Sequence, residues 1–82
     1  MAGDSIHAII EQAKKRYRSN RCIPTSIGTA ARTCQRYLNV RYLFMVANDI
    51  PAGTDLNHWG SSVDEVLAAF DKTLALATKE QP

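Results

Sequence analysis

Apolar side chains recur near the start of the chain at the spacing of one face of an α-helix. They are Ile6, Ile9, Ile10, Ala13 and Tyr17. Asp4 precedes this stripe and is suited to cap the helix, because its carboxylate can accept a hydrogen bond from a free amide of the first turn. The pattern predicts a helix that ends near Ser19, with Asn20 as the stop residue.

A second apolar stripe follows Pro24 and predicts a helix that starts at Thr25 or Ser26. Its members are Ile27, Ala30, Ala31, Cys34, Tyr37 and Leu38. On such a helix Arg32 and Arg36 stand one turn apart on a single face, outside or beside the stripe. Cys34, as part of the stripe, is expected to be an inert buried thiol.

The stretch from Val40 to Ala47 is apolar and rich in aromatic and β-branched residues, a composition that also suits a strand. No second strand is evident to pair with it, and a lone strand cannot satisfy its ladder of hydrogen bonds. We therefore expect a short buried helix or a continuation of the second helix past Asn39, with a strand as the open alternative. The segment 48–53 ends this element, since Pro51 cannot continue a helix and Gly53 permits a turn.

The last predicted helix is the clearest. Ser62 and Glu65 fit a capping box, in which each side chain satisfies a backbone amide of the other residue. The apolar face that follows runs to about Thr78 and consists of Val63, Val66, Leu67, Phe70, Leu74 and Ala77. Together these elements predict an all-α fold, a small single-domain bundle of three or four short helices over residues 1–82, with an ordered core of about residues 4–78.

Size and composition narrow the classes of function. A chain of 82 residues has a stability on the order of 4–12 kcal/mol, which leaves little margin for a strained catalytic cleft. The first residues lack the features of a signal peptide, and no apolar run approaches the roughly 20 residues of a membrane span. We therefore expect a cytoplasmic protein that is no enzyme and contacts no membrane.

Few residues are candidates for metal or redox chemistry. Four residues are possible zinc ligands, namely His7, His58, Cys22 and Cys34, but no close C-x-x-C or H-x-x-x-H pair supports a zinc site. Two cysteines in one chain do not form the dense framework of a small secreted domain, so both are interpreted as reduced thiols. We expect no metal, no cofactor and no catalytic residue.

Charge is divided along the chain. Residues 1–41 hold eight Lys and Arg against two acidic residues, a net charge of +6, whereas residues 42–82 hold two Lys against six acidic residues, a net charge of −4. A field of one sign attracts a partner of the opposite sign. The division therefore favours a binding function for the basic half.

The candidate binding residues are the cations of the basic half, one tyrosine and the loop tryptophan: Lys14, Lys15, Arg18, Arg21, Arg32, Arg36, Arg41, Tyr37 and Trp59. Arg, Tyr and Trp are the residue types that dominate protein–protein contacts. The sequence thus favours a non-enzymatic regulatory or adaptor protein that binds an acidic surface of another protein. The alternative is a purely structural interpretation, in which the cations form solvated helix faces and Trp59 closes the core.

Nucleic-acid binding is the alternative function. Lys and Arg, including Arg16, can neutralise phosphates, and tyrosine rings can stack on exposed bases. A helix-turn-helix version of this hypothesis uses the segment from Thr25 to Val46. The opposed charges of the two halves also allow a homodimer, in which the basic half of one copy attracts the acidic half of another.

Overall fold

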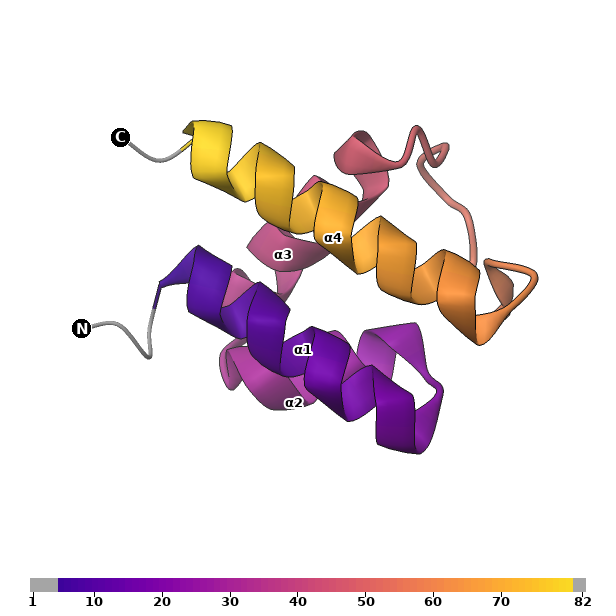
Figure 1. Cartoon of the computed structure of the whole chain (residues 1–82). Helices are drawn as coiled ribbons and strands as arrows, with labels where there is room; N and C mark the ends of the chain where they lie inside the picture. Colours follow the sequence, from indigo (N-terminus) through magenta and orange to yellow (C-terminus); the bar gives the residue numbers. More distant parts are fainter. Residues whose placement is uncertain (1–4, 81–82) are drawn as a thin grey trace.

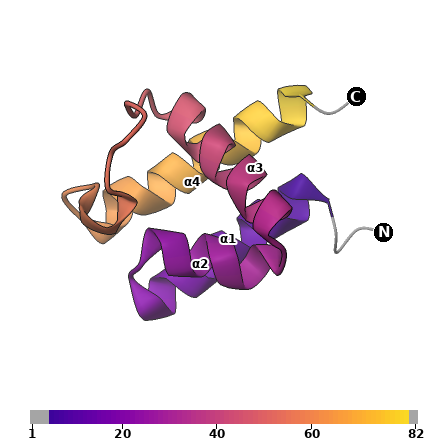
Figure 2. The same ribbon diagram turned by 180° about the vertical axis from the view of Figure 1, so that it is seen from behind.

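In a computed structural model, which describes residues 5–80, the chain folds into α-helices joined by short connections. The elements are α1 (Ile6–Asn20), α2 (Ile23–Ala31), α3 (Cys34–Ala47), the 3-10 turn η2 (Leu56–His58) and α4 (Val63–Glu80). Helices α1 and α4 lie side by side and run in opposite directions, with α2 and α3 behind them (Figure 1). Seen from the other side, α3 crosses over α4 (Figure 2). The predicted all-α bundle is confirmed.

Helix α1 begins at Ile6 because Ser5 caps it. The Ser5 hydroxyl accepts a hydrogen bond of 3.0 Å from the Ala8 amide, which satisfies one of the free donors of the first turn. The expected cap, Asp4, lies outside the described residues.

The carboxyl end of α1 is built by two adjacent residues. Arg21 adopts the left-handed conformation (φ 58°), and its amide donates to the Tyr17 carbonyl at 2.9 Å. The side-chain oxygen of Asn20 accepts hydrogen bonds from the Cys22 amide at 2.9 Å and from the buried Ser26 hydroxyl at 2.8 Å. Asn20 is thus the predicted end of α1, and its amide group also fixes the corner that leads into α2.

The prediction of one helix from Thr25 to Leu38 is wrong. Helix α2 begins earlier, at Ile23, and ends at Ala31, where Arg32 turns the backbone into the left-handed region (φ 69°). Thr33 then caps α3, its hydroxyl accepting from the Arg36 amide at 3.2 Å. The break rotates the residues that follow away from the apolar face of α2. Cys34 is therefore exposed, against the expectation of a buried thiol, and Leu38 is 49% exposed.

Helix α3 includes the apolar stretch after Asn39, so the helical interpretation of that stretch is confirmed. Val40 and Phe44 are fully buried, but Tyr42 is 67% and Val46 47% exposed, so the expectation of a wholly buried helix is wrong. The helix ends at Ala47, where the Asn48 side-chain amide donates to the carbonyls of Phe44 (2.9 Å) and Ala69 (3.2 Å). Asn48 thereby ties the end of α3 to α4.

The amino end of α4 closely follows the predicted capping box. The Glu65 amide donates to the Ser62 hydroxyl at 3.1 Å, as expected. The Glu65 carboxylate accepts from the amide of Ser61 rather than that of Ser62. The helix runs to Glu80, slightly beyond the predicted end at Thr78.

A row of four aromatic rings connects α1, α4, α3 and the loop before α4. Ring centroids are 6.0 Å apart between Tyr17 and Phe70, 5.0 Å between Phe70 and Phe44, and 5.6 Å between Phe44 and Trp59. Aromatic pairs at such separations contribute about 0.5–1.5 kcal/mol beyond the burial of their surface. The row explains how a small chain holds its helices in one arrangement.

Candidate functional site

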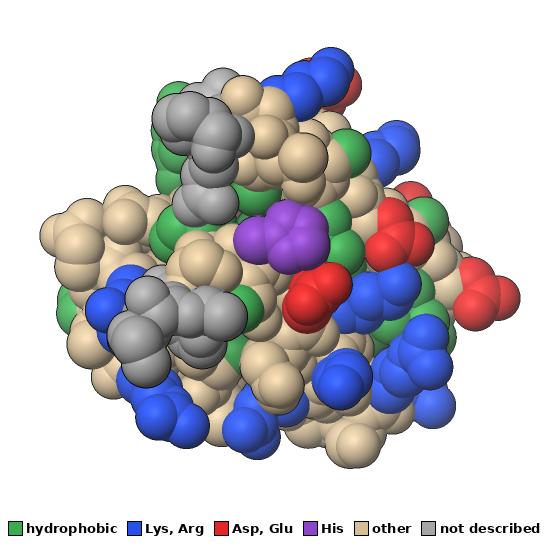
Figure 3. Space-filling view, turned by 60° about the vertical axis from the view of Figure 1, so that its left-hand side comes forward, with side chains coloured by type: hydrophobic (Ala, Val, Ile, Leu, Met, Phe, Trp, Pro, Cys, Tyr) green, Lys and Arg blue, Asp and Glu red, His purple; other side chains and the backbone are tan. Residues whose placement is uncertain are grey.

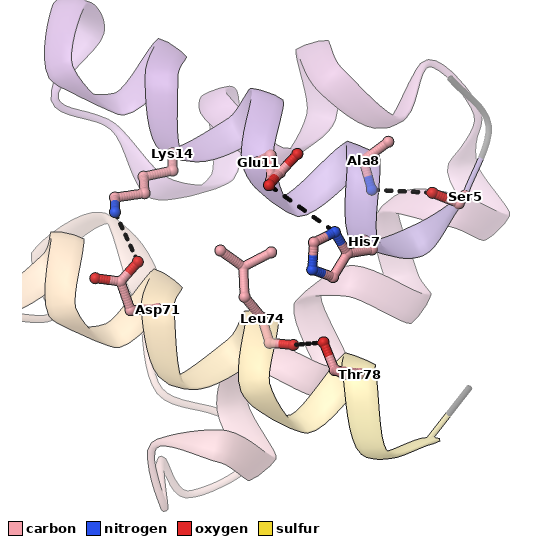
Figure 4. A network of polar contacts seen from close by, with 8 residues as sticks. All are labelled: Ser5, His7, Ala8, Glu11, Lys14, Asp71, Leu74 and Thr78. Carbon is pink, nitrogen blue, oxygen red and sulfur yellow. Dashed lines mark hydrogen bonds and ion pairs between the residues drawn. The ribbon is translucent and has the colours of Figure 1, made fainter. Parts of the chain in front are cut away.

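Lys14, one of the predicted binding residues, is engaged within the protein. Its ammonium lies 2.6 Å from the Asp71 carboxylate of α4, and its side chain is 25% exposed (Figure 4). Beside this pair, Leu74 of α4 points toward α1 (Figure 4). Lys14 therefore belongs mainly to the contact between α1 and α4.

Lys15 and Arg18 lie on the outer side of α1 and are exposed. Together with Lys14 they border a shallow groove between α1 and α4, which also includes Glu11 and Leu74. This groove mixes charges of both signs, so it carries no specific anion site.

Three arginines from separate segments line a different groove, called here the arginine groove. Arg16 comes from α1, Arg32 from the break between α2 and α3, and Arg36 from the first turn of α3. The groove has a volume of about 330 Å³ and includes the polar side chains of Gln12 and Thr29. None of the described residues that line it is acidic. Guanidinium groups stay protonated at any physiological pH, so each of the three side chains keeps its positive charge.

The break at Arg32 explains how the arginine groove forms. Helix α2 runs back along α1 and brings its carboxyl end beside the middle of α1 (Figure 2). The left-handed backbone of Arg32 then redirects the chain, and Arg36 follows one turn into α3. The prediction that Arg32 and Arg36 share one helix is wrong, but the two side chains do lie in the same groove.

Arg16 completes the groove, and the sequence predicted it only for the nucleic-acid hypothesis. Gln12 and Arg16 are one turn apart on α1 and flank its buried stripe on the side of α2. A cation that lines a groove beside the core can be recognised in the sequence by its position at the edge of the apolar stripe of its helix. The signal does not reveal which segment of the chain faces that edge.

The other predicted cations lie elsewhere. Arg21 occupies the corner between α1 and α2, where its Nε donates to the Arg18 carbonyl at 3.4 Å. Arg41 lies further along α3, beside a groove formed with Asp49 and the loop that follows. The structure therefore divides the predicted set into separate places instead of one face.

The tyrosines are not interleaved with the cations of the arginine groove. Tyr17 is buried in the core, and the half-buried Tyr37 packs against the core close to Gly28. Tyr42 is exposed, but it lies beside Arg41 and Val46 rather than in the arginine groove. Trp59 is half-buried and packs against Phe44, as the structural interpretation of the sequence expects.

One face of the molecule shows how part of the charge is distributed on the surface. Figure 3 shows Lys and Arg side chains gathered along the lower side of one face, where α1 and α2 lie. The acidic residues of α4 include Asp64, Glu65 and Asp71, of which Asp71 is paired with Lys14. On this face most of the visible cations therefore lie over α1 and α2, whereas Arg41, Lys72 and Lys79 border other grooves.

Three further features of the described residues concern possible metal ligands, the two thiols and the apolar character of the helices. No group of three or more His, Cys, Asp and Glu side chains among residues 5–80 is placed to hold a metal ion. Cys22 and Cys34 are both free, and the Cys22 thiol donates to the Asn57 side-chain oxygen at 3.2 Å. None of the helices in this range combines the length and the apolar character that crossing a bilayer requires.

Comparison of the chain with protein-family models, with curated proteins and with solved structures finds no match.

Proposed function

We propose that the protein is a non-enzymatic binding protein whose arginine groove holds an acidic segment of a partner protein. The observation that carries this proposal is the convergence of three guanidinium groups, from Arg16, Arg32 and Arg36, on one groove. Guanidinium groups match carboxylates geometrically, since each can form two parallel hydrogen bonds with one carboxylate. A segment rich in Asp and Glu is therefore the ligand that this groove fits best.

The backbone at Arg32 has a conformation that is unusual for a residue with a side chain. A left-handed residue at the end of a helix is most often glycine, because a side chain there costs about 1–2 kcal/mol. Arg32 adopts this conformation (φ 69°) although it is not a glycine. The positive charge of Arg32 at the carboxyl end of α2 interacts favourably with the helix dipole by about 0.3–1 kcal/mol. This gain offsets only part of the conformational cost. Arg21 has the same conformation at the end of α1 outside the groove, so the argument for Arg32 rests on its place in the groove.

Nucleic-acid binding is less well supported. Single-stranded nucleic acid is held by exposed aromatic rings next to cations, whereas Tyr17 and Tyr37 are packed in or against the core. In a helix-turn-helix interpretation α3 enters the major groove, yet its exposed face carries the apolar residues Leu38, Tyr42 and Val46. Both observations favour a protein partner.

The proposal is tested by titrating the isotope-labelled full chain with a synthetic disordered peptide rich in Glu and Asp, followed by NMR. We expect saturable shifts of the amides around Gln12, Thr29 and Arg32, and an affinity that falls as salt is raised. Arg16→Gln and Arg32→Gln should each weaken binding about tenfold, as expected when a charged hydrogen-bond donor is lost. Lys15→Gln, an exposed substitution on α1 outside the arginine groove, is the matched control.

Duplex and single-stranded oligonucleotides in the same assay separate the alternative. Binding through about five phosphates gives a slope of log affinity against log salt near −4 to −5. An oligonucleotide that binds with this slope, while the acidic peptide causes no shifts, would replace the proposed protein partner with a nucleic acid.

A further inference from the structure

The large apolar side chains that are most exposed in the described part of the chain all lie on α3. Leu38 is 49%, Tyr42 67% and Val46 47% exposed. They follow one another at intervals of one helical turn and form a single row, called here the α3 stripe. Helix α3 also buries Val40 and Phe44 on its opposite side, so it is apolar on two faces and covered on one.

The stripe borders two grooves, with Val46 as the ridge between them. The first groove, of about 380 Å³, lies between α3 and the following loop and includes Tyr42 and Ile50. The second, of about 360 Å³, lies between α3 and α4 and includes Ala75 and Leu76. A ridge flanked by grooves is the surface form into which the side chains of another helix interdigitate.

The charges around these grooves indicate the kind of partner. Arg41 borders the first groove, and Lys72 and Lys79 border the second, whereas Asp49 is the one acidic residue among the described lining of both. An apolar centre with a charged rim is the common anatomy of a protein interface. A second copy of the chain would bring the same cations against these, so the charges disfavour self-association through the stripe.

We propose that the α3 stripe is a docking site for an amphipathic helix of a partner protein, with an apolar face toward the stripe and Asp and Glu along its flanks. From Leu38 to Val46 the stripe is about 12 Å long, which matches two to three turns of a helix with anchors at i, i+4 and i+7. This surface is separate from the arginine groove and the inference does not depend on it. A chain that carries both surfaces can hold two segments at once.

Three synthetic peptides of about 20 residues, long enough to form a helix in isolation, test the inference. The first has leucines on one face and Glu on the flanks, the second has Lys in place of Glu, and the third keeps the acidic composition with the leucines scrambled. We expect the first to shift the amides of α3, of the loop after it and of the part of α4 near Leu76. At these amides the second and third peptides should give affinities at least about tenfold weaker.

Variants of the full chain locate the binding site. Tyr42→Ser and Val46→Gln should each reduce affinity for the acidic amphipathic peptide about tenfold or more, as expected for central anchors of an interface. Ala68→Gln, at an exposed α4 position outside both grooves, is the control. The position of the shifts separates this result from that of the arginine groove, because amides of α3 and of α4 near Leu76 report on the stripe and those around Gln12, Thr29 and Arg32 report on the groove.

Several outcomes would overturn the inference. If the peptide with Lys bound as tightly as the peptide with Glu, the partner would not need acidic flanks. If shifts occurred only around the arginine groove, the stripe would not be the binding site of the peptide. Absence of saturable binding by the first peptide would end the inference altogether. Light scattering over a range of protein concentrations tests whether the chain forms a dimer. A dimer that dissociates in the Val46→Gln variant would assign the stripe to a second copy of the chain.

Discussion

Trp59 meets Phe44 edge to face, with the ring centroids 5.6 Å apart and an interplanar angle of 81°. Phe44 is fully buried and Trp59 half-buried, so the indole covers one side of the core. This contact connects the loop before α4 to the middle of α3.

We expect Trp59→Ala to lower the free energy of unfolding by about 2–3 kcal/mol, less than the 3–5 kcal/mol of a fully buried ring. Trp59→Phe retains an aromatic edge and should lose less than half as much. Chemical denaturation followed by circular dichroism measures both. A loss below about 0.5 kcal/mol for Trp59→Ala would show that the ring is not part of the core and would favour its interpretation as a partner anchor.

Gly60 and Gly53 form a matched pair for a second prediction. Both have φ in the left-handed region, 93° and 92°, but a Cβ at Gly60 would come within 2.7 Å of Val66 Cγ2, whereas no heavy atom lies within 4 Å at Gly53. Gly53→Ala should therefore lose only the conformational preference, about 1–2 kcal/mol. Gly60→Ala should lose about 1–3 kcal/mol more, because Val66 is buried and must shift. Equal thermal stabilities for the two variants would contradict the clash.

Arg32→Gly separates folding from binding. Glycine suits the left-handed backbone at φ 69°, so we expect the free energy of unfolding to stay equal or rise by up to about 1 kcal/mol. Affinity for the Glu-rich peptide should fall, because a guanidinium leaves the arginine groove. Arg21→Gly is the control, since Arg21 has the same conformation (φ 58°) at the end of α1 and does not line that groove. If both variants bound the peptide as the parent chain does, Arg32 would have no role in binding.

The Lys14–Asp71 ion pair should contribute little to stability. Its members are 25% and 58% exposed, and pairs of this kind contribute about 0–1 kcal/mol. Asp71→Asn should lower the free energy of unfolding by less than about 1 kcal/mol at low salt, and by less still when salt screens the pair. A double-mutant cycle with Lys14→Gln isolates the coupling between the two side chains. A loss that is independent of salt would attribute the effect to packing.

The first and last helices were predictable from the sequence because each has one apolar stripe and clear end signals. Asn20 ends α1 and Ser62 caps α4. The break between α2 and α3 was not predictable, since the left-handed residue is Arg32 instead of glycine and the apolar spacing continues across it. Periodicity follows an uninterrupted helix and does not register a single residue that changes its backbone region.

The two candidate surfaces were less predictable than the fold. Arg16 and Arg32 are far apart along the chain and meet only because α2 runs back along α1. The apolar sequence of α3 indicates burial, but Tyr42 and Val46 remain exposed because no other described segment covers that side of the helix. Which face of an apolar helix is covered depends on tertiary contacts that a single sequence does not contain.

The exposure of Cys34 gives the protein an intrinsic reporter. Cys34 lies one turn before Leu38 and continues the row of the α3 stripe, whereas Cys22 is half-buried and hydrogen-bonded to Asn57. Iodoacetamide should therefore modify Cys34 before Cys22, as mass spectrometry of partly alkylated protein would reveal. A helix docked on the stripe would slow that alkylation, so the occupancy of α3 can be followed in the unmodified sequence through the chemistry of a single sulfur atom.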